Sequence, residues 1–431
     1  MRRASQLAVV LVAVLIAVGP LRERVAAALP PSGYVVVFRD GVDPEAATAR
    51  LEGRHGFVAG HRYVSALSGF SAQLSAAQLS AVAGDPDVAF HGADRIVVAS
   101  GMVPLARGDR APSGVRRIGA ATTTQAHEAA DVAVAVIDTG IDLGHRDLDA
   151  AAGTNCVARG APPNDDHGHG THVAGTIAAR NDGAGVVGVA PGTRVYAVKV
   201  LNAQGAGTIS QLICGLEWVA RHGVPLGIRV ASLSVGGPGT IDDATCATTT
   251  DALRKAVCSV TSAGVTLVVA AGNGATDLAT TTPAAYPEVL TVSAMTDGDG
   301  LPRALEGPLG CRPVERPDSY ARFSNFAVTE REQKHLISAP GVCVTSTWPG
   351  GAYQTISGTS MAAPHVSGTV ALCFGSGGQR GPCAGLAPNA VIARIRADAE
   401  SHATATNGFS GDPAHGVARR SYGYLVWAGG Y

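Results

Sequence analysis

Three side chains, spread widely along the chain, are of the types that could together attack a carbonyl group. Asp138 ends an apolar run, His169 lies in the glycine-rich segment HGHGTHVAG, and Ser360 opens the apolar part of GTSMAAPH. A serine hydroxyl can act as a nucleophile, a histidine can take its proton, and a carboxylate can fix the tautomer of that histidine. If the fold brings the three together, the chain can perform nucleophilic catalysis.

Each of these residues also has a plainer interpretation when it is considered alone. Asp138 could cap a turn at a strand end, and Ser360 could cap a helix. His167, His169 and His172 form an H-x-H-x-x-H pattern that could hold zinc in a hydrolase. A zinc site gives no role to Ser360, however. A non-catalytic protein that binds peptides is a further alternative, disfavoured because a nucleophile, a base and a carboxylate are all present.

Five apolar runs rich in β-branched residues predict the strands that would position these side chains. Helical stretches separate the runs, and strands that are apolar on both faces are typical of a parallel sheet. The predicted fold class is α/β, with a mostly parallel β-sheet covered by helices on both faces. Ligands of such sheets bind beyond the carboxyl ends of the strands, where Asp138 lies. The five runs are residues 132–137, 194–200, 229–233, 265–270 and 289–293.

The chain before residue 101 carries a shorter pattern. It reads as strand, helix, strand, helix, strand, which is typical of a small α+β, ferredoxin-like domain. Asp43 with Pro44 predicts the start of the first helix, and Ser75 with Gln78 has capping-box spacing before the second. We predict a first domain over 29–100, a linker with the processing site over 101–114 and a catalytic domain over 115–431. The predicted strands are residues 34–38, 70–74 and 88–98.

The first 28 residues have the layout of an export signal. Arg2 and Arg3 precede an apolar run, residues 7–18, and residues 26–28 are small enough for a signal peptidase. The run is too short to span a bilayer comfortably. We therefore predict a signal peptide over residues 1–28 and a secreted protein. An uncleaved anchor and a twin-arginine signal are the alternatives.

The composition of the 431-residue chain excludes two classes of protein. Lys+Arg 33 against Asp+Glu 34 gives a formal net charge of −1, so charge does not drive binding to nucleic acid. Apolar residues make up 46% of the chain, but no segment approaches the roughly 18 continuous apolar residues of a membrane-spanning helix. We expect neither a nucleic-acid partner nor stable membrane insertion.

All eight cysteines lie beyond residue 150, and an even number in an exported chain predicts disulfides. Sequence alone does not fix their pairing. We predict three local pairs, Cys246–Cys258, Cys311–Cys343 and Cys373–Cys383. Buried free thiols are the alternative, above all for Cys156 and Cys214.

Four motifs resemble the signatures of subtilisin-family serine proteases almost letter for letter. They are DTGID, HGHGTHVAG, VAAGN and GTSMAAPH, and the resemblance covers about residues 115–400. It implies a subtilisin-like fold and a serine endopeptidase that cleaves through an acyl-enzyme intermediate. Residues 34–100 resemble the inhibitory propeptide of that family through YVVVF, GFSAQLS and DPDV. The resemblance therefore implies a zymogen whose own propeptide is an intramolecular inhibitor.

The resemblance also implies a role for each residue of the site. Ser360 is the expected nucleophile, His169 the general base and then acid, and Asp138 the carboxylate that orients His169. Asn273 follows a buried run, and it resembles the asparagine that, with the Ser360 N–H, stabilises the oxyanion.

The expected substrate is an extended polypeptide. The resemblance implies that one segment pairs with it as an added strand and that a second segment forms the opposite wall. A roomy, uncharged pocket would give broad cleavage after apolar residues, and we expect a monomer. The implied substrate-binding residues are Gly205, Ala206 and Gly207 on one side, Ser234, Val235 and Gly236 on the other, and Ala271 and Gly272 at the pocket.

The resemblance further implies a structural calcium ion and no organic cofactor. Asp147 and Asp182 would give side-chain oxygens, while Arg180, Ala184 and Val186 would give backbone carbonyls, a donor set that suits a hard cation. A solvated turn is the alternative. A second, weaker cation site is doubtful, because Ser338 stands where an acidic ligand is often found.

Overall fold

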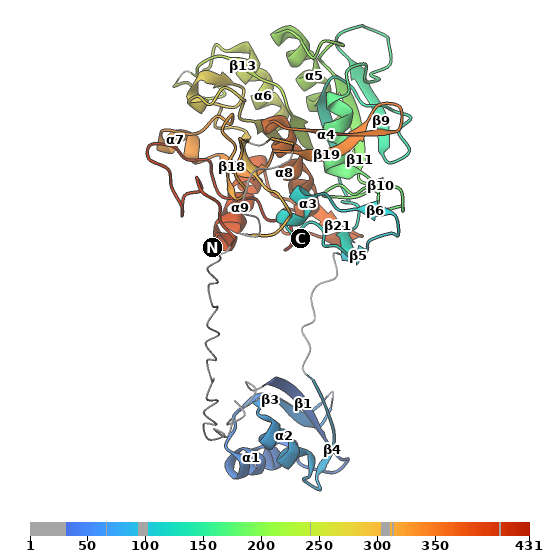
Figure 1. Cartoon of the computed structure of the whole chain (residues 1–431), viewed down its shortest axis with the longest axis vertical. Helices are drawn as coiled ribbons and strands as arrows, with labels where there is room; N and C mark the ends of the chain where they lie inside the picture. Colours follow the sequence, from blue (N-terminus) through green and yellow to red (C-terminus); the bar gives the residue numbers. More distant parts are fainter. Residues whose placement is uncertain are drawn as a thin grey trace, which may run out of the picture. The chain divides into compact units, whose positions relative to one another are not determined.

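The computed structural model describes residues 32–65, 67–93, 102–241, 243–302, 311–312, 314–404 and 407–431. The chain forms two compact units, Met1–Ala99 and Ser100–Tyr431. In Figure 1 the described elements of the first unit are blue, and those of the second run from cyan to red. The expected signal peptide, residues 1–28, lies outside the described residues. Within the described residues, no helix is both long and apolar enough to cross a membrane.

The first unit is an antiparallel sheet with two helices, in the strand order β2-β3-β1-β4. Asp43 caps α1, and Ser75 with Gln78 forms the predicted capping box of α2. Three strands and both helices match the predicted α+β pattern. The strand β2 was not predicted, because its sequence, AGHRY, does not alternate apolar with polar residues. The elements are β1 (Ser32–Phe38), α1 (Pro44–His55), β2 (Ala59–Tyr63), β3 (Gly69–Leu74), α2 (Ala76–Ala83) and β4 (Val88–Ala93).

The second unit is built on a large, mainly parallel sheet. Its strands follow the order β17-β16-β14-β12-β8-β11-β9, and β18 pairs with β16. The five predicted runs all lie in this sheet, so the predicted α/β class is confirmed. The strands are β8 (Ala133–Asp138), β9 (Asp149–Asn155), β11 (Arg194–Lys199), β12 (Ile228–Leu233), β14 (Thr266–Ala270), β16 (Leu290–Thr296), β17 (Ser319–Tyr320) and β18 (Leu336–Pro340).

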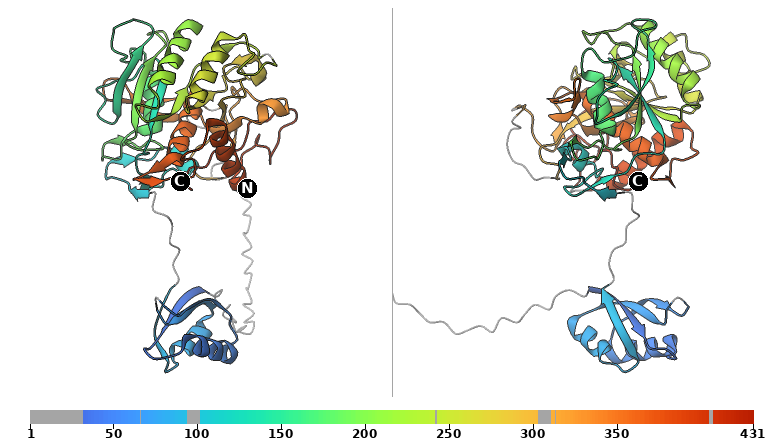
Figure 2. Two further views of the ribbon diagram at one scale, coloured as in Figure 1. Left: turned by 180° about the vertical axis from the view of Figure 1, so that it is seen from behind. Right: turned by 90° about the vertical axis from the view of Figure 1, so that its right-hand side faces the viewer.

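Helices cover both faces of this sheet, because successive side chains of each strand point to opposite sides. Val134 and Val136 of β8 pack with α4, α8 and α9, whereas Ala135 and Ile137 pack with α5 and α6. Figure 2 shows this layered unit from two further directions. The helices are α3 (Ser113–Arg117), α4 (His169–Ala178), α5 (Ile209–His222), α6 (Ala252–Ser262), η1 (Leu278–Thr280), α7 (Glu330–Gln333), α8 (Thr359–Phe374) and α9 (Pro388–His402).

Short two-stranded pairs complete the second unit. They join loops at its rim, including loops beside the carboxyl ends of the parallel strands. The pairs are β5 (Met102–Pro104) with β7 (Gln125–His127), β6 (Asp109–Arg110) with β10 (Gly185–Val186), β13 (Gly237–Pro238) with β15 (Thr281–Thr282), β19 (Val344–Trp348) with β20 (Ala352–Ile356), and β21 (Gly375–Ser376) with β22 (Gln379–Arg380).

Residues 102–114 differ from the predicted linker, because they belong to the fold of the second unit. β5 pairs with β7, β6 pairs with β10, and the Asn181 side chain bonds the backbone of Pro104 and Ala106 at 2.9 and 2.7 Å. Strands of two or three residues are too short to show a sequence period. The proline, glycine and charged residues of this segment therefore resemble a linker although the segment is docked.

The three predicted local disulfides are present, and a fourth joins the two remaining cysteines. Cys246–Cys258, Cys311–Cys343 and Cys373–Cys383 match the predicted pairs. Cys156 and Cys214, for which free thiols were the main alternative, are bonded to each other. This pair could not be predicted from local spacing, because the two cysteines are 58 residues apart and only the fold brings the end of β9 close to α5.

Replacing both Cys156 and Cys214 by alanine is expected to lower the free energy of unfolding by about 4 kcal/mol, because the bond closes a long loop in the unfolded chain. Thermal and urea unfolding of the parent and the double variant would measure the loss. The same double substitution at Cys373 and Cys383, whose separation is only 10 residues, should cost less. A larger loss for the short loop would contradict the loop-entropy argument.

Candidate active site

The three candidate catalytic residues lie at the ends of buried elements. Asp138 is the last residue of β8, His169 is the first residue of α4, and Ser360 is the second residue of α8. The turn before α4 depends on glycine, since Gly168 has φ +110°. At Gly170 a Cβ atom would lie 2.1 Å from the Gly140 carbonyl oxygen, so α4 packs directly on the loop after β8. This close packing brings the first turn of α4 to the carboxyl end of β8.

Asp138 and His169 form a short, buried hydrogen bond. The His169 Nδ1 atom lies 2.7 Å from Asp138 Oδ1, and the Asp138 side chain has no solvent exposure. An ionised carboxylate can only accept, so Nδ1 carries the proton and the lone pair is on Nε2. Burial lowers the pKa of His169, but the Asp138 and Asp165 carboxylates together raise it by more, and the net pKa is above its ordinary value. His169 thus has the tautomer of a general base.

Ser360 lines the same cavity as His169. Its hydroxyl donates to the Ser234 carbonyl oxygen at 3.2 Å. A hydroxyl can rotate between acceptors, and catalytic hydrogen bonds often tighten only when substrate binds. Pro364 has no N–H for the Ser360 carbonyl one turn earlier, and the Ser234 hydroxyl donates to that oxygen at 3.0 Å instead. Ser234 therefore holds the start of α8 at the cavity wall.

Asn273 is oriented with its amide nitrogen available to the cavity. Its Oδ1 atom accepts from the Thr359 N–H at 2.9 Å and from the Thr359 hydroxyl at 3.0 Å. These two bonds fix the flip of the amide, because an oxygen rather than an NH₂ group must face the two donors. Asn273 and Ser360 both line the cavity. The arrangement leaves the amide nitrogen of Asn273 as a possible hydrogen-bond donor at the cavity that Ser360 also lines.

A cavity of about 580 Å³ joins the predicted substrate-binding segments. Ala271 is the exception, since it is fully buried behind the wall and its neighbour Ala270 faces the cavity. In a parallel strand, neighbouring residues face opposite sides, and the sequence did not reveal which one faces the cavity. The predicted residues that line it are Gly205, Ala206, Gly207, Ser234, Val235, Gly236 and Gly272, together with His169, Asn273 and Ser360.

Two residues that the sequence analysis missed organise this site. The Asp165 carboxylate accepts from the N–H groups of His167, Gly168 and Thr171 and so caps the start of α4. Asn325 is buried and accepts from the Gly274 N–H at 3.0 Å, while its amide nitrogen donates to the Ala271 carbonyl at 2.9 Å. Asp165 had a usable signal, an acidic residue just before a helix start. Asn325 had none, because it acts across the fold on the Asn273 loop.

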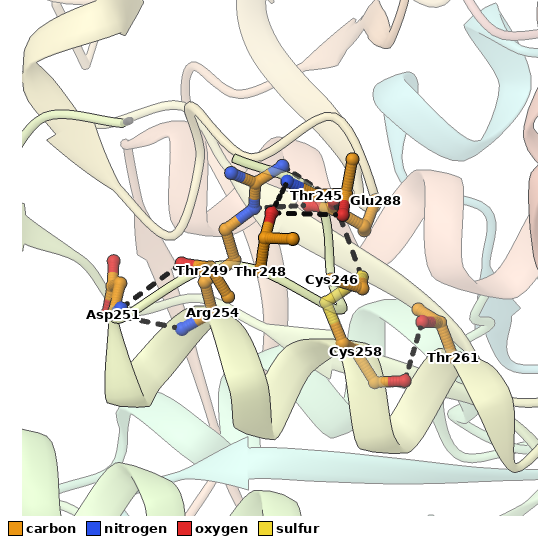
Figure 3. The surroundings of a disulfide bond; sticks show 9 residues. All are labelled: Thr245, Cys246, Thr248, Thr249, Asp251, Arg254, Cys258, Thr261 and Glu288. Carbon is orange, nitrogen blue, oxygen red and sulfur yellow. Dashed lines mark hydrogen bonds and ion pairs between the residues drawn. A yellow bond between two sulfur atoms is a disulfide. The ribbon is translucent and has the colours of Figure 1, made fainter. Parts of the chain in front are cut away.

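The three histidines of the H-x-H-x-x-H pattern do not form a zinc site. His172 is buried, with Nε2 3.0 Å from the Val344 carbonyl oxygen, and burial lowers its pKa to about 4. His167 instead accepts the His169 backbone N–H at 3.3 Å. In the part of the chain that the structure describes, the only set of three or more His, Cys, Asp or Glu side chains whose ligand atoms all lie within 4.8 Å of one another is Cys246, Cys258 and Glu288. Figure 3 shows these two cysteines joined in a disulfide, which removes both as thiolate ligands.

The predicted calcium residues gather around the loop between α4 and β10. Asp147 is buried, and it accepts from the Arg180 N–H at 2.9 Å. Burial raises the pKa of Asp147 to about 7, and the Asp182 carboxylate contributes to this shift. The Tyr353 hydroxyl, 3.0 Å from both Asp147 Oδ2 and the Ala184 carbonyl oxygen, orders two of the expected ligands.

Asp109 is a carboxylate at this loop that the sequence analysis assigned to the linker. It is 9% exposed, and its Oδ2 atom accepts from the Gly183 N–H at 2.8 Å. Its Oδ1 atom is buried without a hydrogen-bond partner among the described residues. Buried carboxylates are normally paired or coordinate metals. Asp109 thus brings an unpaired carboxylate oxygen to the loop that carries Asp182, and carboxylates with loop carbonyls are the donors that a hard divalent cation such as calcium takes.

Comparison with known proteins gives one consistent result. The chain matches the model of the subtilase family over residues 129–409. Subtilisin DY from Bacillus licheniformis is 37% identical over 251 residues, which are 58% of this chain and 78% of that protein. Subtilisin BL from Lederbergia lenta is 40% identical over 263 residues, 61% of this chain and 83% of that protein.

A solved structure agrees with these relatives. The crystal structure of a cold adapted subtilisin-like serine proteinase superposes with a TM-score of 0.53 at 28% sequence identity, covering 74% of this chain and 98% of that one. The family match spans β8, α4 and α8, the three elements that carry the candidate catalytic residues. The chain therefore belongs to the subtilase family of serine endopeptidases.

Proposed function

We propose that this subtilase is a secreted endopeptidase, made as a zymogen, that cleaves extended polypeptides through Asp138, His169 and Ser360. The observation that carries the proposal is the 2.7 Å bond between buried Asp138 and His169 at the wall of a cavity that Ser360 and Asn273 also line. A nucleophile, a base of the correct tautomer and an amide donor at one cavity suit acyl transfer better than binding alone.

The proposed reaction has two stages. His169 Nε2 takes the Ser360 proton while Oγ attacks the peptide carbonyl, and the Asn273 amide and the Ser360 N–H stabilise the oxyanion. His169 then gives the proton to the leaving amine, and an acyl-enzyme forms at Ser360. A water molecule, deprotonated by His169, releases the acid in the second stage. Asp138 stays ionised and stabilises the imidazolium in both.

The proposed substrate preference rests on the walls of the cavity. Among the described residues that line it, His167 and His169 are the only ionisable ones. Small residues at 205–207 and 236–237 leave room for a peptide backbone to pair with them. A side chain entering the pocket beside Ala270 and Gly272 would meet no fixed charge. We infer broad cleavage after apolar residues.

Labelling the mature protein with a serine-directed fluorophosphonate tests the proposal. The label should attach to Ser360, identified by mass spectrometry of tryptic peptides, and the Ser360→Ala variant should remain unlabelled. A matched variant at a nearby buried serine that the mechanism does not use, Ser346→Ala, should still react. Labelling elsewhere, or a fully folded protein that neither reacts nor cleaves peptides, would favour the non-catalytic alternative.

The Asn273 amide should matter for turnover more than for binding, since it is proposed to meet charge that exists only in the transition state. Asn273→Leu is expected to lower kcat by roughly 10²–10³-fold, the loss known for the corresponding donor in subtilisin, with KM little changed. Steady-state kinetics on a peptide amide would measure both. A large rise in KM at constant kcat would point to a substrate-binding role instead.

We also propose that residues 29–100 are a propeptide that assists folding and inhibits the enzyme until it is removed. The proposal rests on the sequence resemblance and on a compact unit of its own, and parallel sheets with many non-local contacts fold slowly. Residues 102–431 expressed alone should yield little active enzyme, and adding residues 29–100 as a separate chain should restore it. Full activity without the added chain would refute the folding role. N-terminal sequencing of the secreted form should find Met102 retained, because β5 belongs to the second unit.

Calcium is the proposed structural ion, held by Asp147 and Asp182 with the carbonyls of Arg180, Ala184 and Val186, and Asp109 is a further carboxylate at the same loop. Bound calcium would neutralise the buried carboxylates and hold the loop after α4. At a calcium concentration a hundred times its Kd the folded state gains about 2.7 kcal/mol. Removal with EDTA should therefore lower the melting temperature, and calcium should restore it. Asp147→Asn should abolish this response, whereas Asp243→Asn, at an exposed carboxylate, should keep it. A parent enzyme with equal melting temperatures in calcium and EDTA would contradict the site.

A further inference from the structure

A lysine ammonium is buried at the carboxyl end of an interior strand of the sheet that carries the active site. Lys199 is the last residue of β11, and its side chain is only 4% exposed. Lysine is almost never fully buried unless it is paired, and removing an ammonium from water costs several kcal/mol. The chain has only two other lysines, Lys255 and Lys334. The burial of Lys199 therefore calls for an explanation beyond packing.

All three donors of the Lys199 ammonium are used. Nζ donates to the Thr139 carbonyl at 2.6 Å, to Asp166 Oδ1 at 2.6 Å and to the Leu201 carbonyl at 2.8 Å. An ammonium has three N–H bonds and accepts nothing, so its hydrogen bonding is complete. A neutral side chain of the same length could not hold these three oxygens together.

The three acceptors belong to three segments of the site, which are the turn after Asp138, the loop before His169 and the edge expected to bind substrate. Thr139 follows Asp138 and donates its N–H to Asp138 Oδ1 at 2.7 Å. Asp166 lies in the loop that leads to His169. Leu201 begins the segment that runs to Gly205 and Gly207 and lines the cavity. In the sheet, Lys199 is the direct neighbour of Asp138, so its side chain starts at the point where these segments meet.

We propose that Lys199 is a positioning residue of the protease. Its ammonium fixes the distances between three segments, which are the turn after Asp138, the loop before His169 and the segment from Leu201 to Gly207 that is expected to bind substrate. The inference rests on the proposed catalytic roles of Asp138 and His169. It explains why a costly buried charge stands where a methionine would pack. A displacement of about 1 Å between catalytic groups can cost on the order of 10²-fold in rate.

The proposal also predicts an effect of the Lys199 charge on the pKa of His169. Asp138 and Asp165 are the anionic groups that act on the His169 ring, and the His167 and His172 imidazoles lie beside it. The Asp166–Lys199 pair adds no net charge to this set. Without the ammonium, the Asp166 carboxylate is unpaired and favours the protonated form of His169. Without Asp166, the unpaired ammonium disfavours that form.

Two variants of the full chain test the inference, Lys199→Met and Asp166→Ala, with Lys255→Met at an exposed site of α6 as the matched control. Active sites are counted with a fluorophosphonate, so that kcat/KM refers to correctly folded enzyme only. Lys199→Met should lower kcat/KM per active site by about ten- to a hundred-fold. The low-pH side of its kcat/KM profile should move to higher pH, and Asp166→Asn in the same chain should move it back. Lys255→Met should match the parent.

The Asp166 side chain is 53% exposed, so Asp166→Ala should fold. This variant therefore tests the inference even if Lys199→Met does not fold. It should move the low-pH side of the profile in the opposite direction, to lower pH. A purely structural role would change the yield of active sites without these opposite shifts. Unchanged kcat/KM and an unchanged profile in both variants would overturn the inference. If Ser360→Ala remains inactive in that case, the proposed catalytic function stands and only the role of Lys199 is lost.

Discussion

Replacing Ser360 by alanine is expected to lower kcat by about 10⁶-fold, a magnitude borrowed from the same change in a subtilisin. The variant keeps the cavity, the Asn273 donor and the Asp138–His169 bond but has no nucleophile. It should therefore bind peptides with little change in affinity. The measurement is hydrolysis of a peptide amide by purified mature enzyme, with peptide binding followed by fluorescence anisotropy.

The controls separate loss of the nucleophile from loss of fold. His169→Ala should be as inactive as Ser360→Ala, and the double variant should be no worse, because the two residues act as one unit. Because the variants must be compared without their propeptide, they would be matured by added parent enzyme. Activity of Ser360→Ala within a small factor of the parent would end the proposed mechanism.

Asp138→Asn is expected to lower kcat by about 10⁴-fold while leaving the fold in place, because an amide no longer favours the proton on Nδ1 of His169. The substitution is nearly isosteric at a fully buried position. The residual activity should also have a different pH dependence. The Asp138 carboxylate raises the pKa of His169 above its ordinary value, and activity needs neutral His169. Activity of the parent is therefore lost as the pH falls through this raised pKa.

Removing the carboxylate lowers the pKa of His169, so the low-pH side of the Asp138→Asn profile should lie at lower pH than that of the parent. Profiles of kcat/KM against pH, with active sites counted in both proteins, would measure the shift. Asp142→Asn, at the loop after Asp138, is a matched control that should leave the profile in place. A shift to higher pH in Asp138→Asn would contradict the assigned electrostatics.

The sequence carried most of the information about the larger unit, because its signals are local. Apolar runs that are buried on both faces predicted β8, β11, β12, β14 and β16, and each begins within a residue of the expected position. The motif residues Asp138, His169 and Ser360 stand at element ends, where strand and helix signals change. Capping residues likewise predicted α1 and α2.

Features that depend on contacts across the fold could not be read in this way. Asn325 and Lys199 act on segments that are distant in sequence, and neither has a local pattern that marks it. The Cys156–Cys214 bond was missed for the same reason. Ala271 was predicted at the pocket, although Ala270 faces it. A strand that is buried on both sides is apolar at every position, so its sequence does not show which residues face the pocket. Asp109 was hidden in a segment whose composition is that of a linker.

The docking of residues 102–114 changes where the mature enzyme can be shortened. A chain that starts at residue 115 would lose β5, β6 and the first two residues of α3, and with them the partner strands of β7 and β10. It would also lose Asp109 and the backbone groups that hold Asn181. If that chain were inactive, the loss would reflect missing parts of the protease unit and not only the missing propeptide. Any protein engineered without its leader should therefore begin no later than Met102.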